Sequence, residues 1–440
     1  MNQKKASSSS PFSMGRGDIS NIFRSQPASS GDDSPHLGEK RKDEEPPVLS
    51  KIKPMKRIIL FATCGLMACA GAFAQQEDEP KLVVKPSGRI LMDAGVMHST
   101  DESVDQKLND GVAIPDARVG LSATYGKWKA KVDVGYARQA LSLKDISLDY
   151  NFNKENLVRL GYFVHQFGQQ SATSSSFKIS MEEPLANQAF FNSRLLGAMY
   201  VHAGEKFHAT ASVFAENDAM KMSTDKFGNE AWGVMTRLVW RPMTERGKIF
   251  HVGISGAYES PRYNKTAALS HSSYTLKAPF PTRIASVMAQ EATITDAKAL
   301  WKFSPELTAA CGNFGVEAQY YYVGIKRDNA MPNYSAWGAY SNLRYLIKGQ
   351  GYTYTKADAG IATPDPGSME LVAAYNYSTL TDKDANIYGG KVNDWSLTFN
   401  YYINKYMIWR VRGSITRATD NAAFDNNTVS MLETRLQFKF

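Results

Sequence analysis

Between residue 88 and the C-terminus, apolar and polar residues alternate along many stretches of about ten residues. In residues 127–138, KWKAKVDVGYAR, Trp128 and Val132 share an apolar face and the lysines occupy the opposite face. A strand that crosses a bilayer at a tilt has this length and this period. The alternation continues to the last residue in TVSMLETRLQFKF (428–440), which indicates that the terminus itself lies in ordered structure.

Sixteen segments show this pattern, and an even number is what a single-chain bacterial barrel requires. The alternation is poor in residues 142–152, 292–303 and 334–347. The segments lie at 88–98, 115–125, 127–138, 142–152, 156–163, 194–203, 206–216, 231–241, 247–259, 292–303, 311–325, 334–347, 368–378, 392–403, 406–417 and 429–440.

The connections between these segments give a second test of a barrel, because periplasmic turns are short and outside loops are long. The short set is 125–127, 151–156, 204–205, 242–246, 304–310 and 404–405. The long set includes 99–114, 164–193, 217–230, 260–291, 378–391 and 418–428. Two connections break the rule: 139–141 is a short outside loop, and 347–368 is a long inside one.

A soluble all-β protein is the alternative, because its strands also alternate. Soluble strands average about half this length, and all seven tryptophans fall on the apolar face here. We therefore predict an all-β fold, a transmembrane antiparallel β-barrel of about sixteen strands over residues 88–440. The last strand must pair with the first, because an unpaired edge in lipid leaves backbone groups unsatisfied.

Residues 55–74 have the layout of a secretory signal peptide, with a basic start, an apolar run and an A-x-A ending. We expect cleavage after Ala74, and a lipoprotein site with Cys69 as the lipidated residue is the alternative. Residues 1–54 are polar and without apolar periodicity, so we expect a disordered leader, with Met55 as the physiological start. A short N-terminal segment, 75–87, precedes the barrel.

Composition limits the function classes. The chain has 51 Lys+Arg and 43 Asp+Glu, but much of the excess precedes residue 75, so charge gives little support for nucleic-acid binding. A mature chain that begins after Ala74 keeps Cys311 as its one cysteine, so it forms no intrachain disulfide. A closed β-sheet is another way for an exported protein to be stable.

A barrel of about sixteen strands is too wide for side chains to fill, so an aqueous channel is expected. Strand phase directs thirteen basic and nine acidic side chains inward, and rings of Arg and Lys favour anions. The alternative is that these charges pair across neighbouring strands and form a polar wall. Arg410 and Arg412 are the strongest candidates. The predicted pore-lining bases are Arg118, Lys129, Lys131, Arg159, Arg237, Arg344, Arg410, Arg412 and Arg435.

The run LVRLGYFVHQFGQQSATSSSFKISMEEPLANQAFF (157–191) resembles the phosphate-selective porin O/P family, with its R-x-G-x-F strand, Phe-Gly and Thr-Ser-Ser loop. The resemblance continues in 345–382 and 389–404 and spans most of residues 86–440. It implies a sixteen-stranded homotrimeric porin in which two outside loops and one long periplasmic segment fold into the lumen. A ladder of arginines and a cluster of lysines would draw in phosphate or similar small anions.

The resemblance also implies site residues. The two candidate constriction loops carry Lys178, Arg262, Lys265, Lys277 and Arg283, and the inside segment carries Lys348 and Lys356. Where the family reads Met-Glu-Arg, this chain has Met181, Glu182 and Glu183, and a carboxylate there opposes anions. The C-terminal Phe440 resembles the signal that the barrel-insertion machinery of Gram-negative bacteria reads, which implies an outer-membrane location among lipid and lipopolysaccharide.

Two other function classes are an enzyme and a non-conducting barrel. The six histidines after residue 75 are scattered, with none in a nucleophile motif and no pair at metal spacing, so we expect neither an enzyme nor a metal or other cofactor. His208 and His251 are expected to face the lumen. A non-conducting barrel that acts as adhesin, receptor or structural anchor is the main alternative, because its strands would look the same.

Overall fold

The computed structural model describes residues 80–137, 140–173, 178–191, 194–215, 232–260, 273–424 and 426–440. The leader and the signal peptide expected from the sequence, with Ala74, lie outside these residues, as do Arg262 and Lys265. Among the described residues no helix is both long enough and apolar enough to span a membrane.

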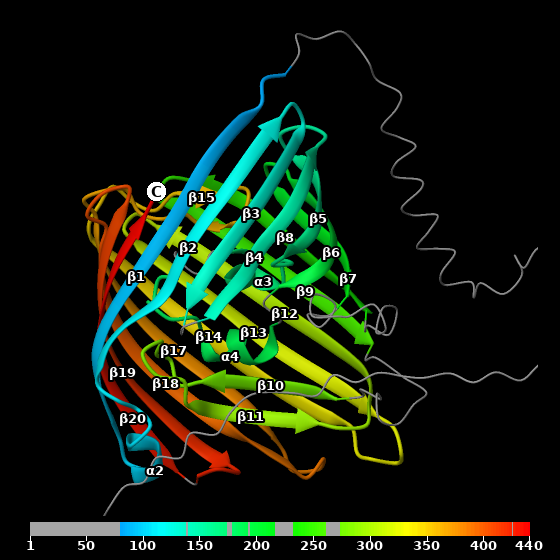
Figure 1. Cartoon of the computed structure of the whole chain (residues 1–440), viewed down its shortest axis with the longest axis vertical. Coiled ribbons are helices and arrows are strands. Elements are labelled where there is room, and N and C mark those ends of the chain that lie inside the picture. The colour runs from blue at the N-terminus through cyan, green and yellow to red at the C-terminus, as the bar shows by residue number, and fades with distance from the viewer. Residues whose placement is uncertain are drawn as a thin grey trace, which may run out of the picture. The chain divides into compact units, whose positions relative to one another are not determined.

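Sixteen strands of the described residues form one closed barrel (Figure 1). Every neighbouring pair is antiparallel, as the alternation of short and long connections predicts. The strands are β1 (Val83–Ser99), β2 (Gly111–Tyr125), β3 (Trp128–Ala137), β4 (Ala140–Asn151), β5 (Asn156–Phe163), β6 (Leu195–Ala203), β7 (Phe207–Ala215), β8 (Trp232–Glu245), β9 (Lys248–Ser260), β12 (Ala297–Cys311), β13 (Phe314–Arg327), β14 (Tyr334–Lys348), β17 (Met369–Asp382), β18 (Ile387–Tyr401), β19 (Met407–Asn421) and β20 (Asn427–Lys439).

The barrel closes through its first and last strands, which confirms the prediction from the terminal alternation. Strand β20 pairs with β1 from Ser99 and Val429 down to Arg89 and Lys439. Beyond it, the Gly88 and Phe440 backbones exchange two hydrogen bonds of 3.1 and 3.0 Å. A barrel closed in this way leaves no strand edge in the hydrocarbon.

Alternate side chains along each strand lie in different surroundings, as the two-residue period requires. In β8, Trp232, Leu238 and Trp240 are exposed on the outside of the barrel. Met235 and Arg237, one residue out of phase, are buried inside. The outer surface is therefore apolar and aromatic, while the inner surface carries the charged residues.

One predicted strand is misplaced and one predicted turn is wrong. Residues 304–310, expected as a turn, continue β12 through Pro305, and the turn lies at Gly312 and Asn313. The N-terminal part of the predicted 292–303 strand instead belongs to a separate hairpin. Proline lacks a backbone donor and usually marks a turn or an edge, which explains the misreading.

Several elements inside the barrel narrow its lumen (Figure 1). They are α3 (Gly168–Ala172), α4 (Leu185–Phe190), the hairpin of β10 (Tyr274–Pro279) and β11 (Met288–Ile294), and the hairpin of β15 (Tyr354–Thr355) and β16 (Gly360–Ile361). Helix α3 packs against β9 and β12, α4 against β13, β14 and β17, and β11 against β17, β18 and β19. The short helix α2 (Glu102–Asp105) lies in the β1–β2 connection. The prediction of inward-folded loops is confirmed.

Candidate functional site

The loop between β5 and β6 is held across the lumen by strand arginines that donate to its carbonyls. The Arg435 guanidinium donates to the Met181 carbonyl at 2.7 Å, and Arg410 donates to the Lys178 carbonyl at 2.8 Å. Met181 itself has φ 67°, in the left-handed region that residues with a side chain seldom adopt. These bonds fix the loop as a constriction inside the barrel.

The Glu182 carboxylate of this loop is buried among arginines. One oxygen lies 2.5 Å from Arg435 Nη2 and the other accepts from Arg283 Nε at 3.1 Å. Burial opposes the charge on Glu182, but the Arg435 and Arg283 guanidiniums outweigh it and lower the pKa of Glu182 below its usual value. Glu182 is therefore an ionised, fully engaged carboxylate.

The periplasmic connection between β14 and β17 also folds into the lumen. Arg237 donates to the carbonyls of Asp358 and Ala359, at 2.8 and 2.9 Å. Tyr352 is 1% exposed and packs under the Arg344 guanidinium at 4.7 Å, and its hydroxyl donates to Glu370 at 2.9 Å. This segment accounts for the one long inside connection seen in the sequence.

Among the residues that the structure describes, the loops leave a cavity of about 600 Å³ inside the barrel. It borders β1 to β6 and the end of β20, on the side away from the wall covered by the hairpin β10–β11 and α4. Its lining has a basic excess, with seven bases and four acids. These are Arg89, Arg118, Lys131, Arg159, Lys178, Arg194, Lys439, Asp133, Asp145, Glu183 and Asp358.

Ion pairs organise this wall. Lys131 lies 2.9 Å from both Asp133 and Asp145, and Arg194 lies 2.7 Å from the second oxygen of Asp145. Arg159 makes a two-pronged contact with Asp149 at 2.7 and 2.8 Å. The ion pairs fix the directions of the cationic groups. They agree in part with the alternative, in which the inward charges pair across neighbouring strands and form a polar wall.

The predicted pore-lining bases divide into two groups. Arg118, Lys131 and Arg159 line the cavity, and Lys129 is exposed at the start of β3 and does not line it. The other five are inward-facing but at most 2% exposed, because loops cover them, so their assignment to the open pore is corrected here. These are Arg237, Arg344, Arg410, Arg412 and Arg435.

The strongest candidates from the sequence, Arg410 and Arg412, belong to that covered group. Arg412 donates to the Pro281 carbonyl at 2.9 Å and lies 3.4 Å from Glu433. The strand pattern correctly predicted that both arginines face the inside of the barrel. It could not predict the loop carbonyls that cover them, because backbone carbonyls leave no signal in a sequence. The two arginines hold loops and do not reach the cavity.

The predicted constriction residues also separate. Lys178 and Glu183 line the cavity, with 3.5 Å between the Lys178 Nζ and a Glu183 oxygen. Lys277 is exposed on β10, and Arg283 pairs with Glu182.

The inside segment was predicted to carry two basic lumen residues, Lys348 and Lys356, and this needs correction. Lys348 is exposed at the end of β14. Lys356 is exposed and lies 3.4 Å from Glu205 in the β6–β7 turn. Because that turn is at the periplasmic end, the lysine is at the rim. Tyr352, Tyr354 and Asp358 are among the side chains of this segment that enter the lumen.

Of the seven cavity bases, Arg89 lies on the inward face of β1, as its strand phase predicts, and two others, Arg194 and Lys439, were missed from the sequence. Arg194 precedes β6, whose outward positions Leu196 and Tyr200 share its phase, so alternation pointed away from the lumen. Lys439 has the correct phase on β20, but its position next to the chain end gave no reason to select it.

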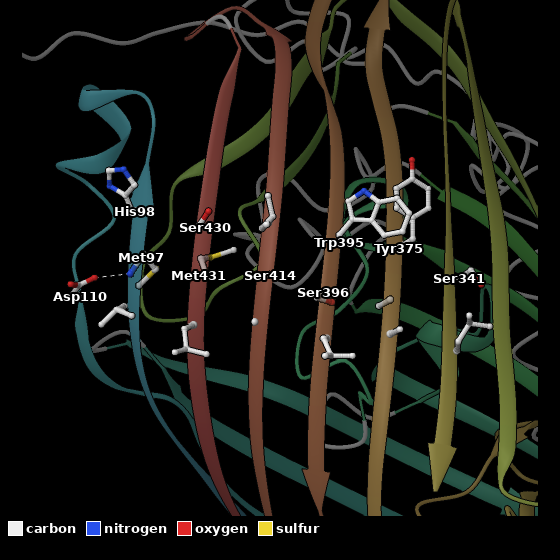
Figure 2. Close-up of a pocket in the computed structure, with 18 of the residues that line it drawn as sticks. Met97, His98, Asp110, Ser341, Tyr375, Trp395, Ser396, Ser414, Ser430 and Met431 are labelled. Carbon is white, nitrogen blue, oxygen red and sulfur yellow. Dashed lines mark hydrogen bonds between the residues drawn. The ribbon is translucent and has the colours of Figure 1, made fainter. Parts of the chain in front are cut away.

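The outer wall carries a separate hollow of about 1150 Å³, over β14, β17 to β20 and β1 (Figure 2). Trp395 and Tyr375 lie side by side in it, with ring centroids 4.2 Å apart. Leu343 and Leu432 line it and are exposed on the outer face. The hollow therefore belongs to the lipid side and not to the route through the barrel.

A closed sixteen-stranded barrel with an apolar outer surface and a charged interior narrowed by loops defines an outer-membrane porin. Such porins lie in the outer membrane of Gram-negative bacteria. The chain belongs to the family described as phosphate-selective porin O and P, which it matches over residues 84–440. It is 24% identical to Porin O of Pseudomonas aeruginosa over 353 residues, covering 72% of this chain and 79% of that protein.

Solved structures share the fold. OmpT of Vibrio cholerae in its trimer form is 9% identical, with a TM-score of 0.52, over 82% of this chain and 99% of that one. An anion-selective porin from Comamonas acidovorans is 11% identical, with a TM-score of 0.51, over 82% and 100%. The outer-membrane channel DcaP of Acinetobacter baumannii is 12% identical, with a TM-score of 0.52, over 84% and 100%.

Proposed function

We propose that this porin is a passive diffusion channel for small hydrophilic solutes, with a preference for anions such as phosphate. The observation that carries the proposal is the lining of the 600 Å³ cavity, where seven bases meet four acids. Charged walls of one sign raise the local concentration of the opposite ion. The description of the family, phosphate-selective porin O and P, supports the same preference.

The proposed path runs along β1 to β6 rather than down the barrel axis. Loops and the inside segment cover the arginines of the opposite wall, so those residues act by holding the constriction. A permeating anion would meet Arg118, Arg159 and Arg194 on the strand side and Lys178 on the loop side. Glu183 would oppose it from the same loop, which would moderate the selectivity.

Further parts of the proposal concern export and assembly. We propose cleavage after Ala74, recognition of the Phe440 terminus by the barrel-insertion machinery, and assembly as a homotrimer. The trimer form of the similar OmpT structure supports the last of these. The mass of the mature N-terminal peptide tests the cleavage site. A peptide that begins with a lipidated Cys69 would contradict cleavage after Ala74.

The proposal includes no catalytic role. The two histidines that strand phase directs inward are engaged in the lumen packing, with His208 2.8 Å from the Gln166 side chain and His251 2.9 Å from the Tyr354 hydroxyl. Both are at most 1% exposed.

Swelling of liposomes that contain the purified protein tests conduction against the alternative of a non-conducting adhesin, receptor or anchor. Liposomes that swell in small sugars or salts support a channel, and liposomes that stay tight support the alternative. Empty liposomes prepared with the same detergent are the control.

A further inference from the structure

The Glu182 carboxylate points from its loop toward the barrel wall, where it contacts Arg435 of β20. Met181, immediately before it, has φ 67° and is fully buried, with its carbonyl held by Arg435. A left-handed backbone at a buried residue persists where the surroundings fix it, and such residues gather at functional sites. The Glu182 side chain itself is 6% exposed.

The carboxylate is bound as a free oxyanion would be. Arg435 and Arg283 each approach a different oxygen, at 2.5 and 3.1 Å. The Arg412 charge adds to the electrostatic stabilisation of this carboxylate. Guanidinium groups that converge on two oxygens are the arrangement by which proteins recognise carboxylate and phosphate.

Other charges surround the cluster without replacing Glu182. Asp93 accepts from Nε and Nη2 of Arg435, at 2.7 and 2.6 Å, and so shares Nη2 with Glu182. Arg412 lies 3.4 Å from Glu433 and 3.5 Å from Asp394. Arg283, 22% exposed, forms its ion pair with Glu182. Without the Glu182 charge, the half-buried Arg283 would face the lumen with an unbalanced positive charge beside Arg435.

We infer that Glu182 acts as an internal anion, which occupies a basic site made by Arg283 and Arg435 and so determines how tightly the channel holds oxyanions. The site adjoins the open cavity, because Glu183, the next residue of the loop, lines that cavity. The inference rests on the proposed anion conduction and deepens it. Because the Glu182 carboxylate occupies the site, a permeating oxyanion such as phosphate does not bind there and passes through the channel.

The loop has anchors that do not depend on this carboxylate. Arg435 and Arg410 hold the Met181 and Lys178 carbonyls, and Asn400 holds the Ile179 carbonyl at 2.9 Å. A neutral side chain at position 182 therefore leaves the constriction in place while it removes the competing charge. The substitution Glu182→Gln keeps the volume and changes the charge alone.

The experiment measures block of the single-channel chloride current by added inorganic phosphate, in planar bilayers of the intact protein. Glu182→Gln is expected to lower the half-blocking phosphate concentration about tenfold or more, the effect of one charge-assisted hydrogen bond gained. Glu183→Gln, on the same loop and facing the cavity, is the matched control. It also removes one negative charge, but it frees only the Lys178 ammonium 3.5 Å away and no pair of converging guanidiniums, so a change of about twofold is expected.

Equal shifts in the Glu182→Gln and Glu183→Gln channels, or no shift in the first, would overturn the inference. Should Glu182→Gln fail to assemble, Glu182→Asp keeps the charge but is too short to bridge Arg283 and Arg435 together, and an intermediate gain in phosphate block is expected. An unchanged block in that variant would also overturn it. A wild-type protein that passes no chloride would instead contradict the proposed function itself.

Discussion

Arg237 on β8 and Glu306 on β12 meet across the intervening strand β9, with 2.6 Å between Arg237 Nη2 and a Glu306 oxygen and neither side chain exposed. The contact passes over Gly253 of β9. A Cβ at that position would lie 3.0 Å from Glu306 Cγ. The same guanidinium donates to the carbonyls of Asp358 and Ala359, so one ion pair joins the wall to the inside segment.

Glu306→Gln is therefore expected to destabilise the barrel by about 3–5 kcal/mol, because it leaves the Arg237 charge buried without its partner. The free energy of unfolding from urea titration in detergent measures the loss. The matched control is Arg246→Gln, which breaks the Arg246–Asp365 pair, whose side chains are 44% and 48% exposed. An exposed pair contributes at most about 1 kcal/mol, and equal losses in both variants would contradict the role of burial.

Arg194→Gln is expected to reduce the chloride-to-potassium permeability ratio about two- to fivefold, since a unit charge about 4 Å away in water is worth about 1 kcal/mol. Reversal potentials in a salt gradient give the ratio. Lys154→Gln, in the exposed β4–β5 turn, is the control and should leave the ratio unchanged. A larger effect at Lys154 than at Arg194 would count against a path along β1 to β6.

The alternation of apolar and polar residues was enough to predict the barrel. Hydrocarbon outside and water inside impose a two-residue period on every strand, whatever the loops contain. All sixteen strands, including the poorly alternating 142–152, exist in the structure. The misplaced strand at 292–303 arose where β11 and β12 follow one another with Thr295 and Asp296 between them. Such a short connection leaves almost no polar interruption in the pattern.

The site was predicted less well, because what covers an inward residue is set by contacts distant in sequence. Arg412 and Arg118 have the same phase and the same chemistry, yet Arg412 lies under the Pro281 carbonyl and Arg118 lines the cavity. Glu182 and Glu183 are adjacent, and one is enclosed by arginines while the other faces the cavity. The left-handed residue Met181, immediately before this pair, has no sequence signature.

Lys178 should give the channel a pH dependence. Burial disfavours its ammonium and lowers the pKa of Lys178 below 10.5, although Glu183 opposes the shift. As the pH rises through the lowered pKa of Lys178, the cavity loses one positive charge. The chloride-to-potassium permeability ratio should therefore fall at a lower pH than that at which ordinary lysines lose their protons. Below 10.5 the unfolded chain binds this proton more readily, so the free energy of unfolding should also rise with pH over the same interval.

Reversal potentials of the wild type and of Lys178→Gln between pH 7 and 10.5 test this dependence. The wild-type ratio should decline over that range, and the variant should start lower and stay flatter. A decline of the same size in both channels would assign the titration to another group.

The close approach of Phe440 to β1 should make the last residue important for assembly. A Cβ at Gly88 would lie 2.5 Å from the Phe440 ring, so Gly88→Leu cannot keep the ring in place. Both Gly88→Leu and Phe440→Ala are expected to reduce the amount of heat-modifiable, folded barrel in outer-membrane fractions. Phe314→Ala, an exposed aromatic in the outer wall, is the control. Equal yields from all three would contradict a closing role for the terminus.

The measurement that tests the central claim most directly is the reversal potential of the wild-type channel in a planar bilayer with a potassium chloride gradient. A basic cavity along β1 to β6 predicts a reversal potential with the sign of the chloride equilibrium potential. Added phosphate should reduce the chloride current and so move the reversal potential away from that value. A potential of the sign set by potassium, or a bilayer with no conductance although folded protein is inserted, would contradict it.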